Sequence, residues 1–400
     1  MRLFTYRFWW WAALALLLVC LPTFGTLTPD SAEADVQALV GFGPRVPGTP
    51  ASEQARTYLM REYSQAGYVT ELRSFTYPKF EDLGSTLTIG DVPLKGRALN
   101  RSPVGQLTAP LVVVPAVGRP NDFAAVDVTG AIAIVRRGEI RFLEKARNAG
   151  AAGAVGLVIV NTNSNELFGS LDGEVNIPVL GLSGKQGEPL LNQDSTQPPK
   201  ASLNVNVRVE TVTGYNVIAH LPNVKQPNLL FGGHYDSVPN SPGANDNASG
   251  TAVVLGLARR LKDTPLANQA WFVAFDGEED GLRGSKAFVN AAGPQFLSNL
   301  QAMLNFDMVG VNDQLFVGGT ESLTTLAQKA NPKVSTIRDT GMSDHESFAT
   351  AKVPVLFFYR GQDPNYHTSK DTVVDSKLLE ATAQVAQSVF RYRFEAPSSP

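Results

Sequence analysis

The chain has 400 residues, of which 43% are apolar and 18% are charged, and its formal net charge is −3. This composition is typical of globular domains and excludes a disordered or fibrous protein. The length exceeds one ordinary compact core, so we expect two folded units. The absence of any dense lysine and arginine run in the sequence argues against nucleic acid or an anionic membrane surface as a partner.

The N-terminus has the pattern of an export signal. Arg2 and Arg7 precede an apolar run over Phe8–Leu21, which is shorter than the ~18 residues that a spanning helix needs. We therefore predict a signal peptide over residues 1–25, with an uncleaved signal anchor as the alternative. The protein is expected to be secreted or periplasmic and to meet a membrane only through this segment. The single cysteine, Cys20, lies in the leader, which excludes cysteine catalysis in the mature chain.

Residues 30–84 are predicted to begin the main domain, with a helix over Ser52–Ala66. Residues 90–200 differ, because short β-branched runs recur there around one helical stretch, Glu139–Ala149. We interpret them as a small β-rich module inserted into the main domain. Its predicted strands are Leu111–Val114, Ala131–Val135, Val155–Val160 and Ile177–Leu182.

Residues 205–395 are predicted to form most of the main domain. Apolar runs alternate there with amphipathic stretches, a pattern that indicates an α/β domain with a mostly parallel, buried sheet. The predicted strands are Leu229–Phe231, Ala270–Phe275, Ala302–Phe306, Leu315–Val317 and Val353–Phe358, and the predicted helices are Ser249–Leu261, Arg283–Ala292, Leu323–Ala330 and Ser376–Phe394.

Polar side chains of metal-ligand type follow several of these predicted strands. The binding crevice of an open α/β sheet lies at the carboxyl ends of its strands, so side chains that are distant in sequence should meet there. Two histidines with several carboxylates form a ligand set for zinc or a similar divalent metal. The residues concerned are His234, Asp236, Asp246, Glu278, Glu279, Asp307 and His367.

Four carboxylates in this set have distinct expected tasks. Two metals need a bridging carboxylate, and Asp246 is the best candidate because its loop is rich in glycine and asparagine. Asp236, two residues after His234, is placed to accept the second ring N–H of that histidine. In the pair Glu278-Glu279, one side chain can bind a metal while its neighbour takes a proton from the attacking water.

These residues fall in motifs that resemble the M28 metallopeptidase family, in matching order and spacing from about residue 216 to 394. The resemblance implies a phosphorylase/hydrolase-like three-layer α/β/α sandwich with a mostly parallel central sheet and two co-catalytic zinc ions. The motifs are His234-Tyr-Asp236, Gly243-Ala-Asn-Asp246-Asn-Ala-Ser-Gly250, Asp276-Gly-Glu278-Glu279-Asp-Gly-Leu-Arg-Gly-Ser285, Asn305-Phe-Asp307-Met308 and Tyr366-His367-Thr-Ser-Lys-Asp371-Thr372.

The resemblance also implies a role for each residue. Glu278 would be the general base, and Tyr366 would donate a hydrogen bond to the tetrahedral oxyanion. The metal ligands would be His234 and Asp307 on one zinc ion, Glu279 and His367 on the other, and Asp246 between them.

The inserted module resembles a protease-associated (PA) domain, which implies that it shapes access to the site and takes no part in the chemistry. The similar segments are Gly130-Ala-Ile-Ala-Ile-Val-Arg-Arg-Gly138, Phe142-Leu-Glu-Lys-Ala-Arg-Asn-Ala-Gly-Ala151 and Asn176-Ile-Pro-Val179.

The function predicted on this basis is a zinc-dependent exopeptidase that hydrolyses N-terminal residues from peptides. A carboxylate-rich site favours a substrate ammonium over a substrate carboxylate. The alternatives are a metallo-carboxypeptidase or dipeptidase of the same family, a glutaminyl cyclase-like acyltransferase, and a non-catalytic receptor-like homologue. A serine hydrolase has little support, because the sequence contains no G-x-S-x-G motif.

Four other polar residues each have two interpretations. His220 is expected to be structural rather than a ligand. His345 is either a pocket-lining residue or part of a capping box, Ser343-Asp-His-Glu346, that opens a helix. Asp371 either caps the last helix or belongs to the site, and Arg360 is either a surface arginine or a clamp for a substrate carboxylate.

Overall fold

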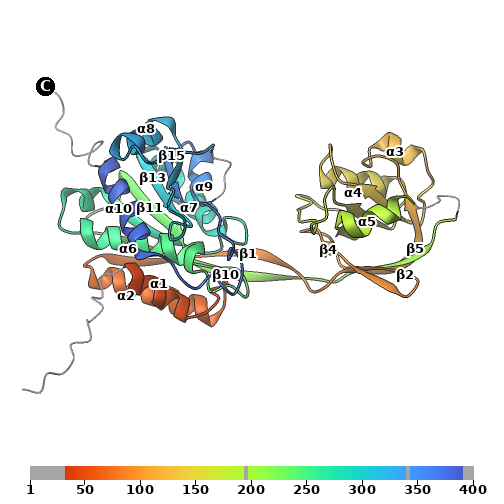
Figure 1. The fold of residues 1–400 in the computed structure, drawn as a ribbon, viewed down its shortest axis with the longest axis horizontal. Coiled ribbons are helices and arrows are strands. Elements are labelled where there is room, and N and C mark those ends of the chain that lie inside the picture. Colours follow the sequence, from red (N-terminus) through yellow and green to blue (C-terminus); the bar gives the residue numbers. More distant parts are fainter. Residues whose placement is uncertain (1–31, 193–196, 339–342, 391–400) are drawn as a thin grey trace, which may run out of the picture.

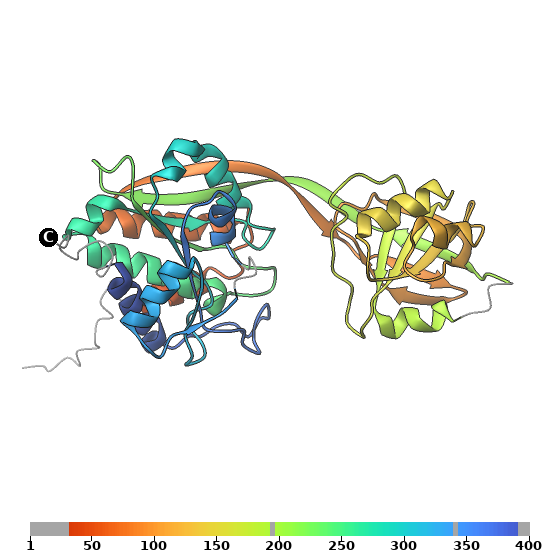
Figure 2. The same ribbon diagram turned by 90° about the horizontal axis from the view of Figure 1, so that it is seen from above.

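The computed structural model describes residues 32–192, 197–338 and 343–390, which form two folded units joined by a long two-stranded ribbon (Figure 1). The ribbon consists of β1 (Val69–Asp82) and β10 (Val207–His220), which pair antiparallel along their whole length. Figure 2 shows these two strands running side by side from one unit to the other. The predicted leader and Cys20 lie outside the described residues, and no helix within them is long and apolar enough to cross a membrane.

The first unit is built on an eight-stranded sheet in the order β1-β10-β12-β11-β13-β16-β14-β15. The four central strands, β12, β11, β13 and β16, run parallel, as the continuous apolar runs predict. Besides the ribbon, the strands are β11 (Leu229–His234), β12 (Ala270–Phe275), β13 (Ala302–Phe306), β14 (Phe316–Gly319), β15 (Ser335–Thr336) and β16 (Val355–Tyr359).

Helices cover both faces of this sheet and complete the predicted α/β/α sandwich. Side chains of α1, α2, α6, α8 and α10 pack on one face, and those of α7 and α9 pack on the other. The helical elements are α1 (Ala32–Gly41), α2 (Pro50–Gln65), the π-helical turn η1 (Ala244–Ala248), α6 (Ser249–Leu261), the 3-10 turn η2 (Pro265–Gln269), α7 (Arg283–Ser298), α8 (Glu321–Ala330), α9 (His345–Thr350) and α10 (Ser376–Phe390).

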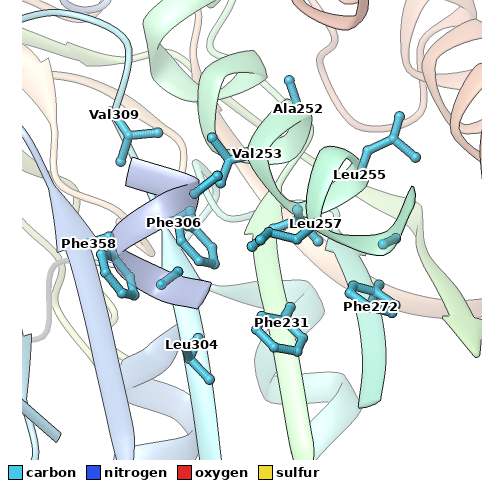
Figure 3. Close-up of a cluster of buried hydrophobic side chains, with 14 of the residues drawn as sticks. Phe231, Ala252, Val253, Leu255, Leu257, Phe272, Leu304, Phe306, Val309 and Phe358 are labelled. Atoms are coloured by element: carbon cyan, nitrogen blue, oxygen red, sulfur yellow. The ribbon is translucent and has the colours of Figure 1, made fainter. Parts of the chain in front are cut away.

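Stacked aromatic rings fill the core beneath α6 (Figure 3). The ring of Phe231 lies 5.2 Å from that of Phe272, and the ring of Phe306 lies 4.7 Å from that of Phe358, between centroids. Each pair joins neighbouring strands, because β11 pairs with β12 and β13 pairs with β16. This packing fixes the strand ends, from which the polar site residues emerge.

The second unit has its own eight-stranded sheet, in the order β3-β2-β9-β5-β6-β7-β8-β4, with a hydrophobic cluster on each face. Its strands are β2 (Thr86–Ile89), β3 (Val92–Lys95), β4 (Arg97–Ala98), β5 (Gly105–Val113), β6 (Ile132–Arg136), β7 (Gly156–Val160), β8 (Val179–Leu182) and β9 (Lys200–Val205), and its helices are α3 (Pro120–Ala124), α4 (Phe142–Ala151) and α5 (Gly184–Leu191).

Several element boundaries differ from the sequence prediction for local reasons. Helix α4 begins at Phe142 rather than Glu139, because Glu139 has a φ of 54°, which a helix does not allow. Helix α7 continues past Ala292 to Ser298 through a kink at Gly293, where φ is 77°. Strand β11 includes both glycines after Phe231 and ends at His234, so this histidine is a strand residue.

Candidate metal centre

The predicted ligand residues converge at the carboxyl ends of the parallel strands. His234 ends β11, Glu278 and Glu279 follow β12, and Asp307 directly follows β13. Asp246 lies in η1, at the start of α6. His367, in the loop after β16, completes the group. The sheet therefore brings together residues that are far apart in sequence.

Asp246 lies between the two histidines. Its Oδ1 is 3.3 Å from His234 Nε2, and its Oδ2 is 3.2 Å from His367 Nε2. On one side, Asp307 Oδ1 is 3.5 Å from His234 Nε2, and on the other, Glu279 Oε2 is 3.1 Å from His367 Nε2. The arrangement has two halves, each with one histidine and one carboxylate, and Asp246 is shared.

Several buried ligand atoms at this centre lack a protein partner. His234 Nε2, Glu279 Oε1 and Asp307 Oδ1 make no hydrogen bond, although a buried polar atom normally has one. Glu278 Oε2 lies 3.9 Å from His234 Nε2. The ligand atoms of His234, Glu278 and Asp307 all lie within 4.8 Å of one another. The same holds for the ligand atoms of His234, Asp246 and Glu279. Imidazole and carboxylate are zinc ligands, so these residues fit divalent metal ions.

The protonation of this cluster also favours the binding of cations. Burial raises the pKa of Glu278 well above its usual value and that of Glu279 to about 7. Burial lowers the pKa of His367, but hydrogen bonds to Asp246 and Glu279 outweigh it and bring that pKa to about 10. Without metal the group therefore retains protons, which bound dications would displace.

Asp236 orients three site residues from beneath. Its carboxylate accepts hydrogen bonds from the backbone N–H groups of Glu278 and Glu279, each at 3.2 Å. His234 Nδ1 hydrogen-bonds the backbone oxygen of Asp236 at 3.2 Å and lies 3.4 Å from the same carboxylate. Because Asp236 is fully buried, these contacts fix the end of β11 against the loop after β12.

Asp371 braces the loop that carries Asp246. Its two carboxylate oxygens accept the backbone N–H groups of Asn245, at 2.8 Å, and Asp246, at 3.1 Å. The interpretation of Asp371 as a helix cap is wrong, because α10 begins only at Ser376.

The chain matches known proteins along most of its length. Residues 216–390 match Peptidase family M28, and residues 107–190 match the PA domain. Aminopeptidase YwaD of Bacillus subtilis is 33% identical over 358 residues, which cover 83% of this chain and 77% of YwaD. The chain belongs to peptidase family M28.

Solved structures of similar sequence share the fold of this M28 peptidase. An aminopeptidase from Aneurinibacillus sp. strain AM-1 superposes with a TM-score of 0.79 at 31% identity, over 90% of this chain and 92% of that chain. BSAP, a zinc aminopeptidase from Bacillus subtilis, gives a TM-score of 0.73 at 30% identity, over 91% and 94% of the two chains.

Tyr366 lies at the edge of the M28 site. Its ring stacks on that of His367, with centroids 3.7 Å apart. Burial raises the pKa of Tyr366 above its usual value, so the hydroxyl remains a donor at neutral pH. The ring is one wall of a cavity of about 350 Å³ over the metal ligands. The residues around this cavity are Asp246, Glu278, Glu279, Asp307, Met308, Phe357, Tyr359, Gln362 and Tyr366.

The segment before α9 does not form the capping box. Ser343 Oγ accepts a hydrogen bond from Asn305 Nδ2 at 2.8 Å, whereas the N–H of Glu346 donates to the backbone oxygen of Ser343. The N-cap is Asp344, whose side chain caps nothing; it is fully buried, and burial raises its pKa to about 7. His345 stacks 4.3 Å from Phe357 and thereby supports a wall of the cavity.

His220 and Arg360 have structural roles. As predicted, His220 is no ligand, because it bonds Glu71 at 3.0 Å and stacks on Trp271. Both interpretations of Arg360 are wrong: the side chain is buried and donates to backbone oxygens, including that of Asp313 at 2.6 Å.

Arg45 is a site-bracing residue that the sequence analysis missed. Its guanidinium is fully buried and donates to the backbone oxygens of Tyr235, at 2.6 Å, and Gly243, at 2.9 Å, as well as to that of Pro242. These bonds tie the end of β11 to the loop before Asp246. An arginine among the turn residues Pro44 to Pro50 was the only signal, and it does not reveal burial.

The bracing role of Asp371 leads to a prediction. In Asp371→Ala, two buried N–H groups lose their acceptor, so we expect the metal-free protein to lose about 1–3 kcal/mol of unfolding free energy. Zinc affinity, measured by competition with a chelator, should fall about 10–100-fold because the Asp246 loop loosens. Asp91→Ala, at an exposed position of the second unit, is the matched control. Unchanged zinc affinity in Asp371→Ala would show that the brace is dispensable.

Proposed function

We propose that the protein is a zinc aminopeptidase that removes residues from the free amino end of peptides. The observation that carries this proposal is the shared position of Asp246 between two histidine–carboxylate pairs, next to the separate carboxylate of Glu278. Relatives named aminopeptidase and zinc aminopeptidase support it.

In this proposal the five ligands hold two zinc ions. When bound, the ions lower the pKa of a water molecule and polarise the scissile carbonyl. His234 and Asp307 would hold one ion, Glu279 and His367 would hold the other, and Asp246 would be shared.

Glu278 is proposed as the general base. It lines the cavity, and its Oε2 lies 3.9 Å from His234 Nε2, farther than the carboxylate oxygens of Asp246 and Asp307. It takes a proton from the attacking water and delivers it to the leaving amine. Burial, which raises its pKa, helps it to hold that proton between the two transfers. Asp236 assists by fixing the backbone of Glu278 and the ring of His234.

Tyr366 is proposed as the donor to the oxyanion. Its hydroxyl is protonated, and its ring is held against His367 at the wall of the cavity. A donor fixed in this way stabilises the negative charge that develops on the carbonyl oxygen in the transition state.

The preference for the amino end follows from charge. Glutamates and aspartates surround the cavity, and among the described residues that line it there is no lysine or arginine. With two zinc ions bound, the four lining carboxylates would balance the four positive charges, and the nearby carboxylate of Asp236 would leave the site slightly acidic. Such a site favours a substrate ammonium, whereas a substrate carboxylate would need a cationic clamp. Arg360, the candidate clamp, is occupied by backbone oxygens. The charge distribution therefore disfavours a carboxypeptidase.

Export is part of the proposal. The predicted signal segment lies outside the described residues. Support comes from a relative in Mycobacterium tuberculosis named probable lipoprotein aminopeptidase LpqL, which is 28% identical over 386 residues, covering 83% of this chain and 76% of LpqL.

Substitutions of the two adjacent glutamates should have different effects on zinc content and on kcat. Glu278→Gln should retain about two zinc equivalents and lower kcat by roughly 10²–10⁴, the usual loss for a general base. Glu279→Gln should instead lose zinc. Elemental analysis and steady-state kinetics on both variants decide between the roles, and a reversed pattern would exchange them. A wild-type protein that is fully active with one tightly bound metal would favour the glutaminyl cyclase-like alternative.

The hydroxyl of Tyr366 can be tested alone. Tyr366→Phe keeps the ring that stacks on His367, so zinc content should be unchanged, while kcat should fall about 10²-fold or more through loss of the oxyanion donor. Tyr359→Phe removes a hydroxyl from another residue of the same cavity and serves for comparison. If Tyr366→Phe has the kcat of the wild type, Tyr366 only packs against His367 and is not the oxyanion donor.

A matched set of leucyl peptides tests whether the enzyme removes residues from the amino end or from the carboxyl end of the substrate. We expect N-acetylation to abolish cleavage, because it removes the ammonium that the acidic site attracts, and C-amidation to be tolerated. Product analysis by mass spectrometry shows which residue leaves. If amidation blocks cleavage and acetylation does not, the protein is a carboxypeptidase and the charge argument fails.

A further inference from the structure

A second cavity, of about 410 Å³, lies between the two folded units. It adjoins the cavity at the metal centre, because Glu279 lines both cavities. The proposed chemistry uses nothing else in it. Its lining comes from the ribbon (Pro78, Lys79, Phe80, Asp82), from the second unit (Arg97, Ala98, Asn100, Phe168, Gly169) and from the loop and helix after β12 (Glu279, Asp280, Gly281, Arg283).

The wall formed by the second unit exposes an aromatic ring. Phe168 is 61% exposed, whereas the other phenylalanines among the described residues are buried or half-buried. The guanidinium of Arg97 lies over this ring, 4.4 Å from its centroid. The core of the second unit does not use Phe168, and an exposed aromatic ring beside a cation offers both apolar contact and a charge to a ligand.

The charge of this cavity differs from that of the cavity at the metal centre, which is lined by four carboxylates and by no lysine or arginine among the described residues. Three cations (Lys79, Arg97, Arg283) face three anions (Asp82, Glu279, Asp280), and Arg97 also pairs with Glu166 at 3.7 Å. Lys79 neutralises Asp280 at 2.9 Å. Arg283 contacts the ring of Tyr77 and donates to the backbone oxygen of Asp280, and among the described residues it has no ion pair.

We propose that this cleft binds the downstream part of the peptide substrate, beyond the scissile bond, and that Phe168 and Arg97 carry the second unit into contact with it. The inference rests on the proposed function. A peptide carries an ammonium at one end and a carboxylate at the other. The charged residues described around the metal-centre cavity are all carboxylates, whereas the adjoining cleft offers cations, among them Arg97 and Arg283. Phe168 contacts apolar downstream side chains, and Arg97 and Arg283 receive carboxylates.

The test compares substrates that differ only beyond the scissile bond. Leucine p-nitroanilide has no downstream residues, whereas leucyl pentapeptides extend into the cleft with either an acidic or a neutral, amidated tail. In Phe168→Ala and Arg97→Ala, the ratio of kcat/KM for the acidic pentapeptide to that for the anilide should fall about tenfold. Arg97→Ala should also lose the preference for the acidic tail, while Phe168→Ala retains it.

The controls separate this inference from the proposed function. Val92→Ala removes an exposed side chain of the second unit outside the cleft and should keep the wild-type ratio. An unchanged ratio in both test variants, or an equal loss on every substrate, overturns the inference. If the wild type cleaves none of these substrates, the proposed function fails. Calorimetry then measures whether the cleft binds the acidic pentapeptide. Phe168→Ala and Arg97→Ala should weaken this binding, and unchanged affinity in both variants would overturn the inference.

Discussion

The constraint on which the structure depends is the burial of several carboxylates at one point. Desolvated carboxylates repel one another, and an isolated one is costly to bury. The fold meets this cost with donors that are built in before any metal binds: backbone N–H groups directed at Asp236 and Asp371, and the fully buried guanidinium of Arg45 nearby. The remaining demand for positive charge fits the binding of cations at this centre.

The bracing contacts also tie the segment between the N-terminal helices to the metal centre. Arg45 lies between α1 and α2, almost two hundred positions from the loop that it holds, and it bonds backbone oxygens on both sides of the metal centre. Asp236 joins the end of β11 to the loop after β12, while Asp371 joins a late loop to η1. The ligands occupy their positions because segments from the whole first unit are tied together beneath them.

The sequence predicted the central sheet well, because a parallel sheet buries both faces of its strands and leaves continuous apolar runs. The bounds of β12, β13 and α6 are those predicted. The convergence of the candidate ligands was also foreseen, since strand ends meet at one edge. Local sequence patterns were misleading where a tertiary contact determines the role of a side chain. Asp371 resembled a helix cap, Ser343 resembled part of a capping box, and Arg360 resembled a surface residue. Each of them instead bonds a group that is distant in the chain. The ribbon was missed because its two strands are separated by the entire second unit.

The register of that ribbon has a consequence for how such a chain can be assembled. Asp82 and Val207 face each other as the last pair of β1 and β10, so the second unit occupies the place of a hairpin loop. Its two ends lie side by side, and the first unit needs no rearrangement to accept a short turn there instead. A whole domain can therefore be gained, lost or exchanged at this point by a single event in the gene, and the catalytic half retains its strand order throughout.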